Sequence, residues 1–151
     1  MTKQHPYDIK IISAPETFPV RHPVLRPGKP IETCNFDGDN LETTFHLGIY
    51  NNNQLLGVVS YFKSSTNLLS EALQYQLRGM AVLDTFQGKG LGNLLVAYGD
   101  TLLKEKKIQV VWCNAREVAK TFYKKNNFKV IGEPFNISDI GLHYVMYKSL
   151  K

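Results

Sequence analysis

A strand, a glycine-rich turn and an amphipathic helix follow one another in the middle of the chain, and this succession limits the fold more than any other feature. Residues 73–83 form a predicted strand, and the glycine-rich turn occupies residues 87–92. Apolar residues then recur at three- and four-residue intervals, which predicts a helix that ends near residues 104–107. Residues 108–113 form a short apolar strand. A strand, helix and strand in this order predict a right-handed crossover within a mixed α/β sheet.

Three further predicted strands and a proline-rich segment precede this crossover. Residues 7–12 form the first strand. Residues 41–50 and 54–62 flank three asparagines, which tolerate left-handed backbone better than most residues, so these two runs predict an antiparallel hairpin. Residues 14–30 carry so many prolines that we expect only short or kinked helix there, in the position of a lid or an edge.

A second helix and two strands are predicted after the crossover. Apolar residues within 115–122 repeat the helical spacing, and Asn126 with Asn127 supplies a left-handed stop. Residues 128–131 and 143–147 then form the last two strands. The predicted fold class is therefore α/β (α+β), with a mixed and mostly antiparallel sheet flanked by helices.

The composition predicts one folded domain, residues 1–151. A hydrophobic fraction of 43% in 151 residues is enough for a core, and an aromatic fraction of 11% argues against a disordered chain. No apolar run approaches the ~20 residues that a membrane helix needs, and the first residues lack a continuous apolar secretion signal, so we expect a cytoplasmic protein. The net charge of +5 suits nucleic acid or a small phosphate-bearing anion and does not choose between them.

The cysteines and the acidic residues indicate neither a disulfide nor a metal site. Cys34 and Cys113 are the only two cysteines, and we expect both as free thiols. Asp37 and Asp39 lie in a stretch that resembles part of a calcium-binding loop, but Gly48 stands where the twelfth loop position requires glutamate. We therefore expect a turn here, and no metal.

The turn at residues 87–92 carries the most specific chemical signal. Its glycines allow a ligand to approach the backbone, and the first turn of the helix offers unpaired N–H groups with a partial positive charge, so together they form a seat for phosphate. The P-loop pattern fails because Lys89 is followed by Gly90, and the dinucleotide pattern fails because the glycines have the wrong spacing. A glycine turn without a ligand is the alternative.

The Q-x-x-G-x-G turn resembles that of the GNAT superfamily of acetyl-CoA-dependent N-acetyltransferases. The strand LRGMAVLDTF before the turn resembles the family's central strand, and NAREVAKTFYKKNNF resembles its second conserved block. Asn127 stands where the family has glycine, but asparagine also accepts a positive φ. A weaker likeness, to a bacterial ElaA-like branch, rests on RHPVLRP, Asp37, Asp39, His46 and DIGLHYVMYK. The resemblance implies a GNAT fold with a sheet splayed at the central strand, acetyltransferase activity, and acetyl-CoA as co-substrate.

The resemblance also implies which residues bind CoA. Backbone amides of the turn would hold the pyrophosphate, the main chain of residues 80–82 would pair with the pantetheine arm like an added strand, and Asn114 would contact the cofactor. The implied cofactor-binding residues are Met80, Ala81, Val82, Gln87, Gly88, Lys89, Gly90, Leu91, Gly92 and Asn114. Lys89, Lys124 and Lys125 could in addition attract the 3′-phosphate, although solvated lysines are the ordinary alternative.

Tyr123 is the implied catalytic acid, because the resemblance places it opposite the CoA sulfur. A phenol with a pKa near 10 can protonate a departing thiolate whose pKa is near 8.5. The proton acceptor is less clear, since the family's usual glutamate on the central strand is Gln76 here. A water chain or one of Glu71, His46 and His143 remains to accept the amine's proton, and each side chain has an ordinary structural role as its alternative. The residues assigned to the substrate pocket are His46, Glu71, Gln76 and His143.

We therefore expect an N-acetyltransferase that moves an acetyl group directly to a primary amine in a ternary complex. A strand interior should bury Cys113, which leaves no cysteine for an acyl-enzyme. The partner would be a small-molecule or protein amine, with no nucleic acid and no membrane, in a pocket formed by residues 15–30 and 133–141. The last strand could pair two copies into a homodimer. The alternatives are a non-catalytic acyl-CoA-binding module and a basic nucleic-acid-binding domain.

Overall fold

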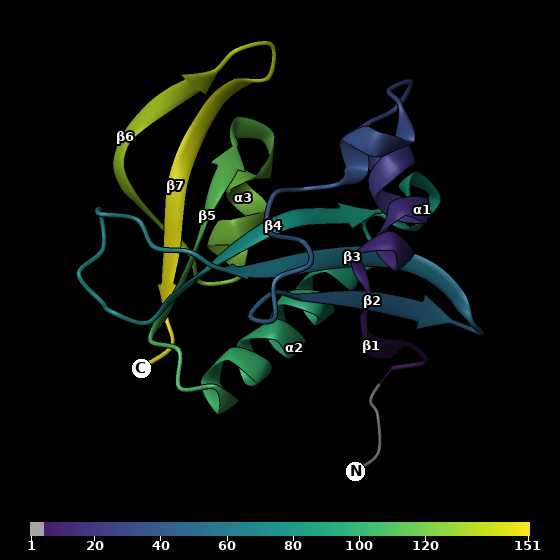
Figure 1. Cartoon of the computed structure of the whole chain (residues 1–151), viewed down its shortest axis with the longest axis horizontal. Helices are drawn as coiled ribbons and strands as arrows, with labels where there is room; N and C mark the ends of the chain where they lie inside the picture. The colour runs from purple at the N-terminus through teal and green to yellow at the C-terminus, as the bar shows by residue number, and fades with distance from the viewer. Residues whose placement is uncertain (1–4) are drawn as a thin grey trace. The chain divides into compact units, whose positions relative to one another are not determined.

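The computed structural model describes residues 5–151, whose elements are drawn in Figure 1. In this part of the chain seven strands form a mixed sheet in the order β1-β2-β3-β4-β5-β7-β6, accompanied by α-helices, which confirms the predicted fold class. The chain divides into two compact units. The first contains the described residues up to Phe62 together with Gly79–Gly99, and the second contains Lys63–Arg78 and Asp100–Lys151.

The first unit contains three consecutive antiparallel strands, β1 (Asp8–Ile12), β2 (Phe45–Asn51) and β3 (Gln54–Lys63). Asn52 and Asn53 join β2 to β3, and their φ angles of 50° and 68° confirm the predicted left-handed turn. The strand predicted to begin at residue 41 begins only at Phe45. The N–H groups of Leu41 and Thr44 instead donate to turn carbonyls, so this stretch is a turn.

Helix α1 (Ala14–Leu25) runs for 12 residues through Pro19 and Pro23, so of the two expected forms, short or kinked, it is not the short one. Ser13 and Glu16 form a capping box, in which each side chain accepts the other residue's backbone N–H, at 3.4 Å and 2.9 Å. The prolines recur at every fourth residue, so they share one exposed face of the helix: Pro15, Pro19 and Pro23. The cap, together with burial of the apolar side chains of Ala14 and Val20, offsets the hydrogen bonds that the internal prolines remove.

The first unit continues with the end of β4 (Gln74–Val82), which leads through the 3₁₀ turn η2 (Asp84–Phe86) into α2 (Leu91–Glu105). The N–H of Leu83 donates to the Leu56 carbonyl at 2.9 Å. Side chains from β1, α1, β3 and β4 form a buried apolar cluster: Ile12, Val20, Val58 and Ala81. This cluster fixes the part of β4 that precedes the glycine-rich turn.

The second unit contains the strands β5 (Val110–Arg116), β6 (Lys129–Ile137) and β7 (Gly141–Ser149). Residues 74–76 of β4 pair in parallel with residues 110–112 of β5, so the strands joined by α2 are parallel, as predicted. β5 and β6 both pair antiparallel with β7, and Figure 1 shows β6 and β7 as a long hairpin.

Two sequence predictions in the second unit are wrong. Ala115, predicted to begin a helix, lies in β5 opposite Tyr144 of β7, because strand pairing overrides the local helical spacing. Helix α3 (Lys120–Lys125) begins later, and Asn127 follows it with a φ of 71°, the predicted left-handed stop. The strands predicted at residues 128–131 and 143–147 are too short, because β6 continues to Ile137 and β7 already begins at Gly141.

No helix among residues 5–151 is both long and apolar enough to span a membrane. The expectation for the start of the chain falls partly on residues 1–4, which lie outside the described residues.

Candidate active site

The glycine-rich turn of the first unit is braced by one side chain and two left-handed glycines. The side-chain amide of Gln87 donates to the Val82 carbonyl at 2.9 Å and to the Asp84 carboxylate at 3.2 Å, so it ties the turn to the end of β4. Gly88 and Gly90 have φ angles of 79° and 80°, a conformation that glycine adopts without steric cost. Helix α2 begins at Leu91, so the last two residues of the turn form the start of the helix.

This turn offers open space and N–H groups to an anion. A Cβ built on Gly88 would meet no atom within 4 Å, and one on Gly90 would reach only the Asn93 side-chain nitrogen at 4.0 Å. The first turn of α2 presents N–H groups without intrahelical acceptors, together with the positive end of the helix dipole. The residues present therefore fit a ligand that carries phosphate, as coenzyme A does.

The end of β4 supplies backbone groups next to the turn. Met80 and Val82 are half-buried, and Ala81 is buried. The Ala81 carbonyl oxygen faces β3, since it lies 3.2 Å from the position of a Cβ on Gly57. Gly79, immediately before Met80, has a φ of 67°, so the strand contains one left-handed residue at this point.

Tyr123 and Asn114, the other residues implied by the resemblance, belong to the second unit. Tyr123 lies on α3 with 7% of its surface exposed, and its ring packs edge-to-face against Phe122 and Phe128 at centroid distances of 5.1 Å and 5.4 Å. Asn114 is exposed on β5 and pairs with Val145 of β7. The contact of either residue with CoA stays a prediction.

The four residues assigned to the substrate pocket do not all belong to the same unit. His46 belongs to the first unit, whereas Glu71, Gln76 and His143 belong to the second. Glu71 forms an ion pair with Lys151 at 3.4 Å, and Gln76 is half-buried on β4. His143 is 4% exposed, and its Nδ1 lies 2.8 Å from a carbonyl oxygen. Their contact with an acceptor amine stays a prediction.

His46 lies in a buried polar network centred on Arg21 of α1. The guanidinium of Arg21 is completely buried and donates to both carboxylate oxygens of Asp39, at 2.7 Å and 3.1 Å. It also donates to the Cys34 carbonyl at 2.8 Å and to the Ser60 hydroxyl at 2.9 Å. This network joins α1, the turn that contains Asp39, and β3.

Both ring nitrogens of His46 have partners. The Asp39 carbonyl oxygen can only accept, so Nε2 donates to it at 2.9 Å. Nδ1 then accepts the hydrogen of the Ser60 hydroxyl at 2.6 Å. This pattern corresponds to a neutral imidazole protonated at Nε2. Burial lowers the pKa of His46 below its ordinary value of 6.5. Burial alone would raise the pKa of Asp39, but the hydrogen bonds from Arg21 and the Phe36 N–H lower it by more, so the net shift is downward.

The free energy of unfolding should fall as the pH drops below about 6.5, because the unfolded chain protonates His46 before the folded chain does. This contribution is complete above pH 6.5 and is lost toward the lower pKa of the folded state, with a limit of about 1.4 kcal/mol per pH unit for one proton. Urea titrations between pH 7 and pH 5 measure this slope. His46→Gln should flatten it, and an equal slope in both proteins would contradict the assignment.

Both cysteines are free and buried. Cys34 is 0% exposed in the first unit, and Cys113 is 2% exposed in the second. Burial raises the pKa of both thiols, so neither carries the thiolate that nucleophilic catalysis needs.

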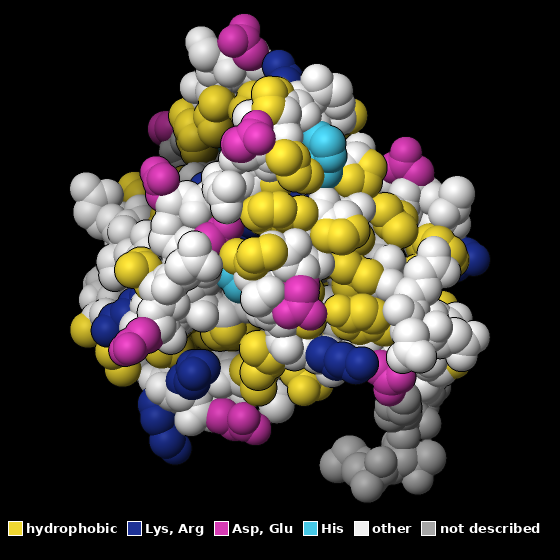
Figure 2. Space-filling model, turned by 45° about the vertical axis from the view of Figure 1, so that its right-hand side comes forward, with side chains coloured by type: hydrophobic (Ala, Val, Ile, Leu, Met, Phe, Trp, Pro, Cys, Tyr) yellow, Lys and Arg dark blue, Asp and Glu magenta, His cyan; other side chains and the backbone are white. Residues whose placement is uncertain are grey.

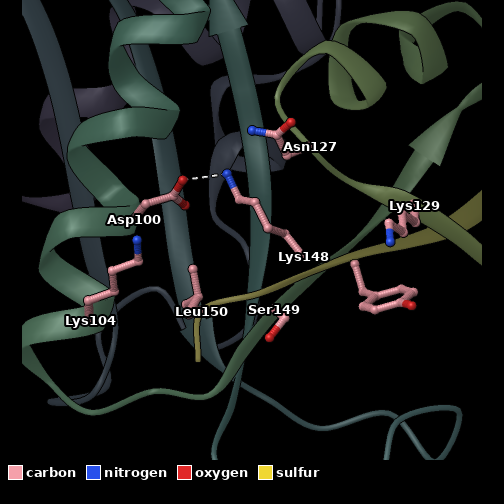
Figure 3. A pocket seen from close by; sticks show the side chains of 8 residues that line it. Asp100, Lys104, Asn127, Lys129, Lys148, Ser149 and Leu150 are labelled. Atoms are coloured by element: carbon pink, nitrogen blue, oxygen red, sulfur yellow. Dashed lines mark hydrogen bonds and ion pairs between the residues drawn. The ribbon is translucent and has the colours of Figure 1, made fainter.

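A separate pocket of about 440 Å³ lies in the second unit, next to the end of α2 (Figure 3). The carboxylate of Asp100 forms an ion pair there with Lys148, which also donates to the Asn126 carbonyl at 3.0 Å. Burial raises the pKa of Asp100 in spite of this ion pair. Lys104 and Lys129 add positive charge to the rim, and none of the residues predicted for the site lines this pocket.

Comparison with known proteins identifies the family. Residues 42–130 match the Acetyltransferase (GNAT) domain model. The uncharacterized N-acetyltransferase YitI of Bacillus subtilis is 42% identical over 144 residues, covering 95% of this chain and 97% of YitI. The ribosomal protein bS18-alanine N-acetyltransferase of Haemophilus influenzae is 34% identical over 92 residues, covering 60% of this chain and 58% of that protein. The crystal structure of an aminoglycoside 6′-N-acetyltransferase complexed with coenzyme A superposes with a TM-score of 0.76 at 11% identity, covering 95% of this chain and 97% of that chain.

Proposed function

The chain belongs to the GNAT acetyltransferase family, and from this premise we propose that it transfers an acetyl group from acetyl-CoA directly to a primary amine. The observation that carries the proposal is the glycine-rich turn, which combines left-handed Gly88 and Gly90 with the N-terminus of α2 and open space for a diphosphate. Acetyl-CoA supplies the activated thioester. One structural neighbour is described as complexed with coenzyme A, which supports the same ligand.

In this proposal both backbone groups and side chains bind and orient acetyl-CoA. N–H groups of the turn at residues 87–92 hold the diphosphate, and Gln87 keeps the turn in place. The main chain of residues 80–82 pairs with the pantetheine arm, and Asn114 contacts the cofactor. Lys89, Lys124 and Lys125 are exposed and attract the 3′-phosphate. CoA should therefore bind more tightly than dephospho-CoA at low salt, and equal or weaker binding of CoA there would contradict that role.

Tyr123 is proposed to protonate the departing thiolate. Tyr123→Phe removes the hydroxyl but keeps the ring that packs against Phe122 and Phe128. We expect kcat to fall by about 10-fold or more, in the range for loss of a general acid, with CoA affinity little changed. Phe122→Leu, on the neighbouring position, serves as the packing control. Steady-state kinetics with calorimetric CoA titration measure both quantities, and an unaltered kcat would remove the assignment.

The transfer is proposed to be direct, within a ternary complex. Both thiols are buried with raised pKa values, so no cysteine offers a route through an acyl-enzyme. An acetylated protein that is sensitive to hydroxylamine, isolated after incubation with acetyl-CoA alone, would contradict direct transfer. The proton of the amine passes to water or to Glu71, His46 or His143.

The acceptor is proposed to be an amine on a small molecule or on a protein. The relatives include an aminoglycoside acetyltransferase and an enzyme that acts on a ribosomal-protein alanine, and these names span both classes. The matched residues 42–130 draw on both units, which supports one acetyltransferase domain over residues 1–151.

Calorimetry with CoA, followed by a CoA-release assay over a panel of amines, tests the proposed function. Binding with turnover is the expected result, binding without turnover on any amine favours a non-catalytic acyl-CoA-binding module, and no heat at millimolar CoA would overturn the proposal. A nucleic-acid-binding domain has less support, because the lysines and arginines visible in Figure 2 are interrupted by uncharged and acidic side chains.

A further inference from the structure

Phe36 lies between the buried network and the left-handed residue of β4. Its ring centroid is 3.9 Å from the guanidinium carbon of Arg21, and its N–H donates to the Asp39 carboxylate at 2.9 Å. A Cβ built on Gly79 would come within 3.0 Å of Cε2 of this ring. The ring therefore packs directly on the backbone of β4, at a position whose φ of 67° and crowding both favour glycine.

The Nε atom of Arg21 also lies near Gly79, and its burial without a hydrogen bond from the described residues costs free energy. This atom is buried without a hydrogen-bond partner among the described residues, and it lies 3.6 Å from the Cβ position of Gly79. Buried ion pairs with such unpaired groups are inefficient at stabilising a fold, but they hold their surroundings in one geometry. In this protein the held geometry is the turn of residues 34–39, which Arg21 grips through the Cys34 carbonyl and the Asp39 carboxylate.

We propose that Arg21 is a positioning residue for acetyl transfer: by clamping residues 34–39 it holds Phe36 against Gly79, and so fixes the backbone of β4 immediately before Met80. The inference rests on the proposed function, in which residues 80–82 pair with the pantetheine arm. A shift at Gly79 would then move the thioester relative to the amine, whereas the diphosphate would stay on the turn at residues 87–92. The kinetic consequence is a loss of kcat without a loss of CoA affinity.

Phe36→Ala tests this proposal while leaving the Arg21–Asp39 pair in place. We expect kcat to fall by about 10- to 100-fold, as for a misplacement of about 1 Å, with the calorimetric Kd for CoA unchanged. In the protein without CoA, the backbone amide of Leu83, which donates to the Leu56 carbonyl at 2.9 Å directly after β4, should exchange hydrogen faster than in the wild type, whereas the amide of Val58 should not. Phe36→Tyr, which keeps the ring, should restore both properties. Phe36→Leu gives the same readouts if the alanine variant does not fold.

A second pair of variants tests the arginine itself. Arg21→Lys keeps the charge but loses the two-pronged bond to Asp39 and the flat surface under Phe36, so it should reproduce the loss of kcat and the faster exchange. Asp37→Asn is the control, because Asp37 lies in the same turn as Phe36 and Asp39 but is exposed. It should leave kcat and exchange unchanged.

Three results would overturn the inference. They are unchanged exchange at Leu83 in Phe36→Ala, faster exchange with unchanged kcat, and a loss of kcat accompanied by an equal loss of CoA affinity. These results are distinct from failure of the proposed function, in which the wild-type protein itself would bind no CoA or acetylate no amine.

Discussion

Gly90→Asp should weaken CoA binding by about 100-fold or more, because opposing like charges costs several kcal/mol and each 1.4 kcal/mol is tenfold in affinity. The new carboxylate would stand at the start of α2, where the diphosphate is proposed to bind, and could occupy the same N–H groups. The nearest side-chain atom to a Cβ there is 4.0 Å away, so the substitution meets no steric obstacle. Aspartate also tolerates the positive φ better than most residues.

Gly90→Asn is the matched control for this prediction. Asparagine has nearly the same shape and the same tolerance of a positive φ, but it is uncharged, so it should keep most of the affinity. Calorimetric titration of both variants with CoA, with circular dichroism to verify folding, separates charge from shape. Equal affinities in the two variants would show that the diphosphate does not bind at this turn.

Asp39→Ala should lower the free energy of unfolding by about 3–5 kcal/mol, because it leaves the Arg21 guanidinium buried without its counter-charge. For a chain of this size the melting temperature should fall by roughly 10 °C. The same change also removes the acceptor of the Phe36 N–H, which anchors the turn. Urea unfolding at pH 7 measures the loss.

Asp37→Ala is the matched control, since Asp37 lies in the same turn but is exposed. Its replacement should change the free energy of unfolding by about 0.5 kcal/mol or less, as for ordinary surface substitutions. If the two variants lost similar stability, the turn itself rather than the buried ion pair would be responsible.

The sequence predicts those elements whose signals are local. The asparagine turn at residues 52–53, the start of α2 after the glycines and the stop at Asn127 follow from backbone preferences of single residues, and the structure has all three. Helix α1 was not predicted at full length, because its prolines suggest a break whereas their four-residue spacing places them on one face. The sequence predicts a helix at Ala115, because its strand partner Tyr144 is distant in the sequence and the pairing leaves no local signal.

The candidate site divides in the same way. The pattern of glycines predicts the turn at residues 87–92. The hydrogen bond from the Gln87 side chain to the Val82 carbonyl is seen only in the structure, because it depends on the path of β4. The Arg21 network was not predicted, although Arg21, Asp39 and His46 all lie in the segments that carry the ElaA-like likeness. Arg21 and Asp39 are 18 positions apart, and no periodicity links residues at such a distance.

Each unit contains one buried cysteine thiol, whose chemical labelling can show when that unit opens. Cys34 lies in the first unit and Cys113 in the second, so an alkylating reagent reaches each one only when the surrounding structure unfolds locally or globally. Labelling followed by peptide mass spectrometry would therefore time the two openings separately in the native protein, without any engineered probe. Equal rates would indicate one cooperative transition, and unequal rates would show which unit opens first.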